Sequence, residues 1–199
     1  MESQRKTDAP WREIVSLLGQ PYVVLDTETT GLLAPEIVSV AVVDREGNPL
    51  LNEFVRPGKP IDPEASRITG IDAETVRDKP EFPAIEPRLR ALLEGRRVVI
   101  YNAAYDLKAL ANTYARYGLS QPQFDPWCAM IWFAQIYGEW NASRGDFTWK
   151  PLSKAAEYFS VAQGAPHDAL DDTMTLWRIL QEAKRRSGQM QGMDRLFSE

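Results

Sequence analysis

The chain has 199 residues, of which 44% are hydrophobic and 26% are charged, and its formal net charge is −5. This size and composition suit one globular domain with a full hydrophobic core. The negative charge excludes a protein that coats nucleic acid by bulk electrostatics, although bound cations can supply positive charge locally.

The single cysteine, Cys128, excludes an intramolecular disulfide and fits a reducing compartment. Residues 1–10 are polar and lack the apolar core of a signal peptide. No stretch is long and apolar enough to span a membrane. We therefore expect a cytoplasmic protein that does not enter the membrane.

The first half of the chain reads as strands followed by short helices. A short amphipathic helix is expected over residues 11–19, where Pro10 starts it and Gly19 and Pro21 end it. Asp62 is a typical N-cap, followed by Pro63 at the first helical position, and Asp72 caps another short segment. Short connections favour an antiparallel meander of three strands at 22–26, 37–44 and 50–55.

In the second half, strands alternate with helices. Hydrophobic periodicity predicts strands at 98–101 and 123–127, and helices at 81–95, 103–118, 129–137, 151–159 and 168–187. Together with the meander, this pattern predicts an α/β fold, in which a mixed five-stranded sheet of three antiparallel and then parallel strands carries helices on both faces.

The stretch Val23-Val24-Leu25-Asp26-Thr27-Glu28 ends an apolar run in two carboxylates. Side chains alternate along a strand, so Asp26 and Glu28 point to the same side. Two adjacent carboxylates at the end of a buried strand repel each other and lose hydration. A divalent metal between them would stabilise the pair, and carboxylate oxygens suit Mg²⁺ or Mn²⁺. The alternative is a strand end with two solvated acids.

Two further segments bring acids to helix starts. Asp106 lies at the edge of the apolar stripe of its helix, from which it can reach the end of the sheet, although dipole compensation alone also explains it. Asp172 falls on the core-facing stripe of the last helix, where a carboxylate needs a partner, whereas Asp171 faces solvent and Asp168 suits a cap. His167, the only histidine, precedes this helix and is a candidate general base.

These residues resemble the three motifs of the DEDDh 3′–5′ exonucleases, a family that includes the proofreading epsilon subunit of bacterial DNA polymerase III. The matches are Asp26-x-Glu28-Thr-Thr-Gly-Leu, Asn102-x-x-Tyr105-Asp106 and His167-x-Ala169-x-x-Asp172, in the family's order. Residues 68–71, Ile-Thr-Gly-Ile, are similar to another family segment. Tyr105 departs from the commoner phenylalanine.

The resemblance implies a ribonuclease H-like fold and a two-metal hydrolysis of phosphodiester bonds at DNA 3′ ends, releasing nucleoside 5′-monophosphates. The metal ligands would be four acids, Asp26, Glu28, Asp106 and Asp172, which would bind two Mg²⁺ or Mn²⁺ ions with Asp26 between them. The catalytic residues would be His167, which would take the proton from the attacking water, and Glu28. Substrate contacts would come from Thr29, Thr30, Gly31, Leu32, Ile68, Asn102 and Tyr105. The exonuclease domain would span residues 21–187, with residues 1–20 a tail and short helix and residues 188–199 a tail.

The segment 127–149 is unusually aromatic. Core packing is the expectation for Trp127, Trp132 and Phe133, whereas Trp140, Phe147 and Trp149 in a polar loop suit core, substrate or partner contact equally. The tail at 191–197 faintly resembles peptides that bind the sliding clamp, and a frayed terminus is the favoured interpretation.

Three alternatives remain open. An RNA-trimming member of the same family shares the chemistry and the motifs, and differs in contacts to the 2′-hydroxyl. A phosphatase with an aspartate nucleophile would favour Asp where Glu28 stands. A non-catalytic nucleic-acid or polymerase-binding module would not need all the motif acids. The partners expected are a single-stranded or frayed 3′ end and, as protein candidates, a polymerase, a sliding clamp or a second copy of the chain.

Overall fold

The structure, a computed structural model, describes the backbone of residues 2–196 and the side chains of residues 9–189. The strands are β1 (Tyr22–Thr29), β2 (Ile37–Asp44), β3 (Pro49–Phe54), β4 (Arg97–Ile100), β5 (Asp125–Cys128), β6 (Trp140–Asn141) and β7 (Asp146–Phe147). The helices are α1 (Glu2–Leu18), α2 (Pro63–Thr69), α3 (Ala73–Val76), α4 (Phe82–Leu93), α5 (Ala103–Arg116), α6 (Ala129–Tyr137), α7 (Leu152–Phe159) and α8 (Ala169–Leu196).

Five strands form the main sheet in the order β3-β2-β1-β4-β5. β1 pairs antiparallel with β2 and parallel with β4, so the meander and the crossover strands meet at β1. β2 and β3 are antiparallel, and β4 and β5 are parallel. This confirms the predicted mixed sheet. β1 lies at its centre and is buried along its whole length except at Asp26.

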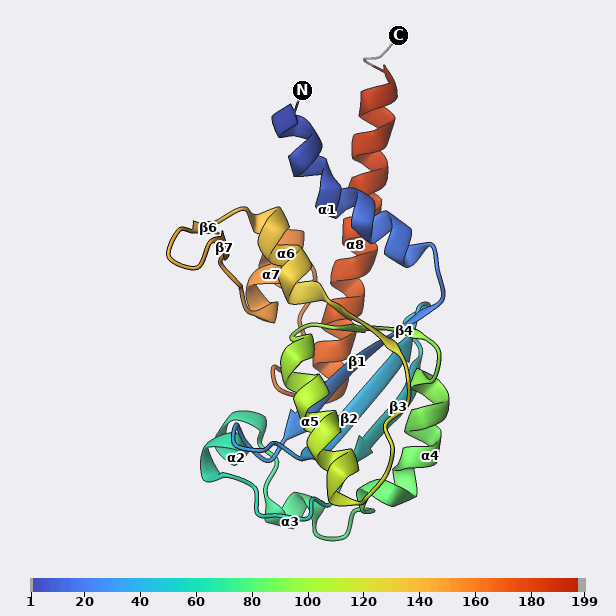
Figure 1. The fold of residues 1–199 in the computed structure, drawn as a ribbon, viewed down its shortest axis with the longest axis vertical. Helices are drawn as coiled ribbons and strands as arrows, with labels where there is room; N and C mark the ends of the chain where they lie inside the picture. Colours follow the sequence, from blue (N-terminus) through green and yellow to red (C-terminus); the bar gives the residue numbers. More distant parts are fainter. Residues whose placement is uncertain (1, 197–199) are drawn as a thin grey trace.

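Helices cover both faces of the sheet (Figure 1). On one face α1, α6, α7 and α8 close a core that includes Ile14, Val24, Val99, Trp132, Phe159, Leu176 and Ile179. On the other face α4 and α5 close a second core that includes Leu25, Val40, Phe82, Leu89, Val98, Leu110 and Tyr114. Branched apolar residues on both sides of β1 thus explain its place between two helical layers.

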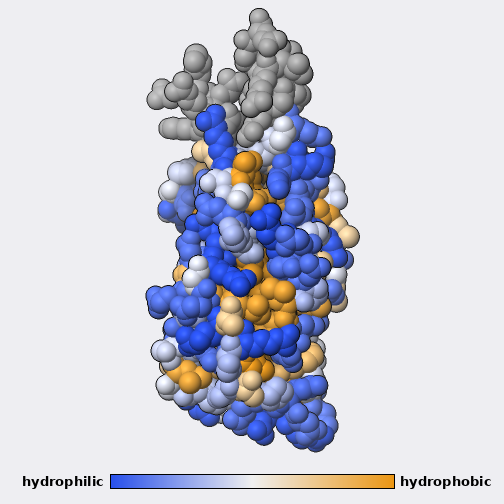
Figure 2. All heavy atoms as spheres, turned by 90° about the vertical axis from the view of Figure 1, so that its right-hand side faces the viewer, coloured by the Kyte–Doolittle hydropathy of each residue, from blue (hydrophilic) through white to orange (hydrophobic). Residues whose placement is uncertain are grey.

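The carboxyl end of β1 lies on the left of Figure 1, near α2, and away from α4. Figure 2 shows the right-hand side of that view, where hydrophobic residues appear in a central strip between hydrophilic ones. Among the residues that the structure describes, no helix combines the length and the apolar character needed to cross a bilayer.

The helix starts predicted from Asp62 and Asp72 are confirmed. The Asp62 side chain accepts a hydrogen bond from the backbone N–H of Glu64 at 2.8 Å, and Pro63 occupies the first helical position. The Asp72 side chain accepts one from the N–H of Thr75 at 2.8 Å. Each cap satisfies a backbone donor that the first turn of a helix leaves without a partner.

Two helices extend beyond their predicted ends. α1 begins at Glu2, so Pro10 lies inside it rather than before it. The carbonyl of buried Pro10 accepts a hydrogen bond from the Trp132 indole at 2.9 Å, and this tertiary packing outweighs the local signal. α8 continues through Gly188 and Gly192 to Leu196, because each glycine lowers helix stability by only about 1 kcal/mol.

The first part of the aromatic segment packs in the core, as predicted. Trp132 and Phe133 are buried with Phe159, whose ring stacks on Trp132, while half-buried Trp127 packs against the Trp132 ring. The predicted polar loop contains the β6–β7 hairpin, in which Trp140 is 57% exposed. The clamp-like segment at 191–197 lies outside the residues whose side chains are described.

Candidate active site

The central strand sends two carboxylates to one face of the sheet. Val24 packs in the core beneath α8, whereas Leu25 packs in the core beneath α4 and α5. Because side chains alternate along a strand, Asp26 and Glu28 share the side of Val24, and Thr27 shares the side of Leu25. The two carboxylates therefore point toward α8, and Thr27 points toward α5.

Asp106, in the first turn of α5, is fixed by Thr27. Its Oδ1 accepts hydrogen bonds from the Thr27 backbone N–H at 3.0 Å and from the Thr27 hydroxyl at 2.7 Å. Burial raises the pKa of Asp106 to about 7, although these two bonds act in the opposite direction. The bonds hold Asp106 close enough to Asp26 to be the largest neighbouring charge on that carboxyl.

The start of α8 supplies the third part of the site. Asp168 caps the helix, since its Oδ1 accepts two backbone N–H groups of the first turn, each at 3.0 Å. His167 has a left-handed φ of +62°, and its N–H donates to Asp172 Oδ2 at 3.1 Å. One ligand atom from each of Glu28, His167 and Asp172 lies within 4.8 Å of the other two. Segments about 140 residues apart in the chain thus meet at the end of β1.

The carboxylates raise each other's pKa. That of Asp26 lies well above its ordinary value, first because of burial and then because of Asp106 and Glu28. The pKa of Glu28 is raised to about 8, by burial and then by Asp172 and Asp106. Burial also raises the pKa of Asp172, against the hydrogen bond from the His167 N–H. Such mutual repulsion is relieved when positive charge lies among the carboxylates.

The donor set fits a divalent cation. Carboxylate oxygens are the ligands that Mg²⁺ and Mn²⁺ prefer, and the dominant neighbouring charges on Asp26 and Glu28 are other carboxylates. Glu28 and Asp106 are almost fully buried, at 8% and 3% exposed, so water does little to screen their repulsion. These residues suit the metal that the sequence predicts at this position.

We expect metal-free protein to lose stability as the pH rises. Between the ordinary pKa of Glu28, 4.5, and its folded value of about 8, the folded state binds more protons than the unfolded chain. Stability therefore falls with rising pH across that window, and the pKa of Asp106, raised from 3.8 to about 7, acts in the same direction. A bound cation removes this penalty. In EDTA the Tm should be lower at pH 8 than at pH 5.5, and MnCl₂ should raise it by roughly 5 °C or more at pH 8, and by less at pH 5.5. An equal effect of MnCl₂ at both pH values would contradict this expectation.

A cleft of about 540 Å³ opens beside Glu28 and His167. All but one of the residues predicted to contact substrate line it, namely Thr29, Gly31, Leu32, Ile68, Asn102 and Tyr105. The Tyr105 hydroxyl donates to the Gly31 carbonyl at 3.1 Å and shares a 2.6 Å hydrogen bond with the Thr29 hydroxyl. This contact joins α5 to the loop after β1 and shapes one wall of the cleft.

Thr30 has a different place from the one predicted. It is 2% exposed and does not line the cleft; its hydroxyl accepts a hydrogen bond from the Glu36 N–H at 3.0 Å. The cleft has further lining residues that were not among the predicted substrate contacts: Leu33, Asp62, Glu64, Ala65 and Thr69. Leu33 is the neighbour of Leu32, and the other four belong to α2, which contains Ile68, or to its N-cap.

His167 also borders a second, smaller hollow. This hollow, of about 150 Å³, lies between α7 and the start of α8 and is lined by Pro151, Leu152, Gln163 and Asp172 among others. His167 therefore lines both the larger cleft and this hollow. The chain enters α7 from the β6–β7 hairpin, and the Arg144 guanidinium of that hairpin lies 4.0 Å from the centre of the Trp149 ring.

Comparison with known proteins finds similarity to exonucleases. A family model described as exonuclease (RNase T) matches residues 23–180. The uncharacterized exonuclease CP81 of Escherichia phage 186 is 37% identical over 163 residues, which cover 77% of this chain and 84% of that protein. The epsilon subunit of DNA polymerase III from Escherichia coli is 31% identical over 118 residues, and the match spans 53% of this chain and 48% of that subunit.

Solved structures share the fold. Exonuclease X in complex with 5′ overhanging duplex DNA has a TM-score of 0.64 at 23% identity, with 84% of this chain and 93% of that chain covered. The nuclease domain of 3′hExo, a DEDDh family member bound to rAMP, has a TM-score of 0.61 at 19% identity, with 83% and 92% covered. The five-stranded mixed sheet with helices on both faces is the arrangement common to them.

Proposed function

The chain belongs to the RNase T exonuclease family, and from that membership we propose that it is a metal-dependent 3′–5′ exonuclease that releases nucleoside 5′-monophosphates from DNA 3′ ends. The observation that carries the proposal is the convergence of four carboxylates and one histidine at the end of β1, beside a cleft of about 540 Å³. DNA is the proposed substrate because curated relatives include epsilon subunits of DNA polymerase III. These relatives are subunits of a DNA polymerase, and on that basis we propose a polymerase partner for this chain.

Two Mg²⁺ or Mn²⁺ ions are the proposed cofactors. Asp106 and Glu28 are the two largest neighbouring charges on Asp26, so Asp26 would be the carboxylate between the two ions. Glu28 and Asp172 would complete one site, and Asp106 the other. Bound divalent ions would lower the pKa of the attacking water and neutralise charge on the phosphate.

The protein groups have separate roles in this proposal. Burial excludes water from Glu28 and Asp106, and the Thr27 hydrogen bonds hold Asp106 in one orientation. His167 is exposed at the rim of the cleft, where its ring can take the proton from the attacking water. The bond from its own N–H to Asp172 fixes the backbone that carries the ring.

Strand polarity and sugar preference are tested together with labelled oligonucleotides. With Mn²⁺, a 5′-labelled single-stranded DNA should shorten one nucleotide at a time, and the released product should be the 5′-monophosphate. A DNA with a blocked 3′ end is the matched control and should stay intact. A matched RNA should be shortened roughly tenfold more slowly or worse, because a site selective for DNA must reject the 2′-hydroxyl. Faster cleavage of RNA would show an exoribonuclease, and internal cuts would contradict an exonuclease.

A further inference from the structure

The loop between β1 and β2 exposes two adjacent leucines at the rim of the cleft. Leu32 is 77% exposed and Leu33 is 88% exposed, and both line the cleft together with Glu28 and His167. Neighbouring apolar side chains that a protein holds in water mark a contact surface for a ligand. The two leucines can form such a contact surface only if the loop that carries them, residues 31–36, is held in place.

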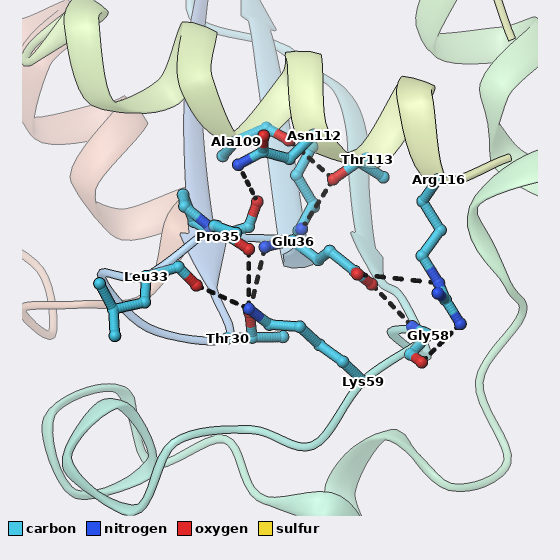
Figure 3. Close-up of polar contacts among 12 residues, drawn as sticks. Thr30, Leu33, Pro35, Glu36, Gly58, Lys59, Ala109, Asn112, Thr113 and Arg116 are labelled. Carbon is cyan, nitrogen blue, oxygen red and sulfur yellow. Dashed lines mark hydrogen bonds and ion pairs between the residues drawn. The ribbon is translucent and has the colours of Figure 1, made fainter. Parts of the chain in front are cut away.

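Side chains from elsewhere in the chain bind three successive carbonyls of this loop. Lys59 Nζ donates to the carbonyls of Leu33 and Ala34, both at 2.7 Å, and Asn112 Nδ2 donates to that of Pro35 at 3.1 Å (Figure 3). Ala34 has a left-handed φ of +44°, which a residue with a β-carbon adopts only when its surroundings impose it. The charge-assisted bonds from Lys59 supply that constraint.

The segment that carries Lys59 is itself anchored to α5. The buried Glu36 side chain accepts a hydrogen bond from the Gly58 N–H at 2.8 Å, and Arg116 Nη2 donates to the Gly58 carbonyl at 2.6 Å. Arg116 Nε also lies 3.7 Å from Glu36 Oε1 (Figure 3). A β-carbon at position 58 would lie 1.8 Å from Arg116 Nε, so a larger residue there would displace the Arg116 guanidinium from the Gly58 carbonyl. Lys59 therefore reaches the loop from a fixed base.

We propose that Lys59 is a positioning residue, which fixes the loop so that Leu32 and Leu33 meet the 3′-terminal nucleotide. This inference rests on the proposed exonuclease function and adds a positioning residue to it. Two of the three ammonium N–H groups of Lys59 bind the loop. In this proposal Lys59 acts through the leucines that it positions.

Lys59→Met tests the proposal because methionine keeps much of the aliphatic stem and removes the donors. For a single-stranded DNA the variant should raise KM about tenfold and change kcat less than about twofold, since the lost contact is a binding contact remote from the reacting phosphate. Lys79→Met is the matched control, because Lys79 lies over the Phe54 ring and away from the loop, and it should leave both constants unchanged. An unchanged KM in Lys59→Met would overturn the proposal.

A double-mutant cycle separates positioning from direct phosphate binding. In a Leu32→Ala, Leu33→Ala background, Lys59→Met should raise KM less than about twofold, because the side chains it positions are gone. A second tenfold rise in that background would show that Lys59 binds substrate itself, and the proposal would be wrong.

Amide hydrogen exchange tests the constraint independently of catalysis. The amides of Thr30 and Glu36, which are hydrogen-bonded to each other's residue across the base of the loop, should exchange at least about tenfold faster in Lys59→Met, whereas α2 should exchange as in the wild type. If the wild type fails to shorten DNA, the proposed function falls and this measurement still decides whether Lys59 holds the loop. Unchanged exchange there would contradict the positioning role.

Discussion

Asp172→Asn should lower the rate of DNA hydrolysis roughly a thousandfold at saturating Mn²⁺, with the fold retained. The reason is that Asp172 is one of three groups whose ligand atoms meet within 4.8 Å, and a metal site contributes several kcal/mol to phosphate chemistry. The asparagine Oδ1 can still accept the His167 N–H, so the backbone before α8 keeps its conformation. Single-turnover rates on 5′-labelled DNA measure the loss.

The same variant should be more stable than the wild type when metal is absent. The pKa of Asp172 is raised by burial and by nearby carboxylates, so its charge opposes folding, and an amide removes that charge. A few degrees' rise in Tm in EDTA, with loss of stabilisation by Mn²⁺, would show that the acid is kept for function at the expense of stability.

Asp171→Asn is the matched control for Asp172→Asn. It removes the same charge one residue away, where the Asp171 carboxylate accepts the Ala165 N–H at 2.7 Å, and the amide oxygen can replace that acceptor. Its rate should stay within about twofold of the wild type, as is usual for a substitution outside the reacting groups. Near-normal hydrolysis by Asp172→Asn would contradict the assignment of the site.

His167→Asn should lower the rate about a hundredfold at neutral pH, the lower range of the contribution of a general base. Asparagine is suited to this position because it tolerates a left-handed φ, here +62°, and so keeps the backbone while removing the imidazole. Stopped-time assays at neutral pH and saturating Mn²⁺ measure the loss.

Two measurements distinguish loss of a base from loss of structure. The Tm of His167→Asn, with and without Mn²⁺, should match that of the wild type within a few degrees, because the His167 ring is exposed. Added imidazole should restore part of the activity, since it can enter the adjoining hollow of about 150 Å³. A variant with the full wild-type rate at neutral pH would disprove the role of His167 as base.

The sequence by itself determined the direction of each acidic side chain relative to its own element. Strand alternation placed Asp26 and Glu28 on one side of β1, and helical periodicity separated Asp172 on the core-facing stripe from Asp171. In the structure Asp172 lies near Glu28, whereas Asp171, which was expected to face solvent, is half-buried and bound to the loop before α8. Local patterns suffice here because backbone geometry alone fixes such directions.

Only the tertiary structure decided which elements meet. The bonds from Thr27 to Asp106 join residues 79 positions apart, and the contact exists because β1 and β4 are neighbours in the sheet. The hydrogen bonds from Lys59 to the loop after β1 likewise join segments with no sequence pattern in common. Periodicity describes one element at a time, whereas these contacts depend on the order of strands and the path of the chain between them.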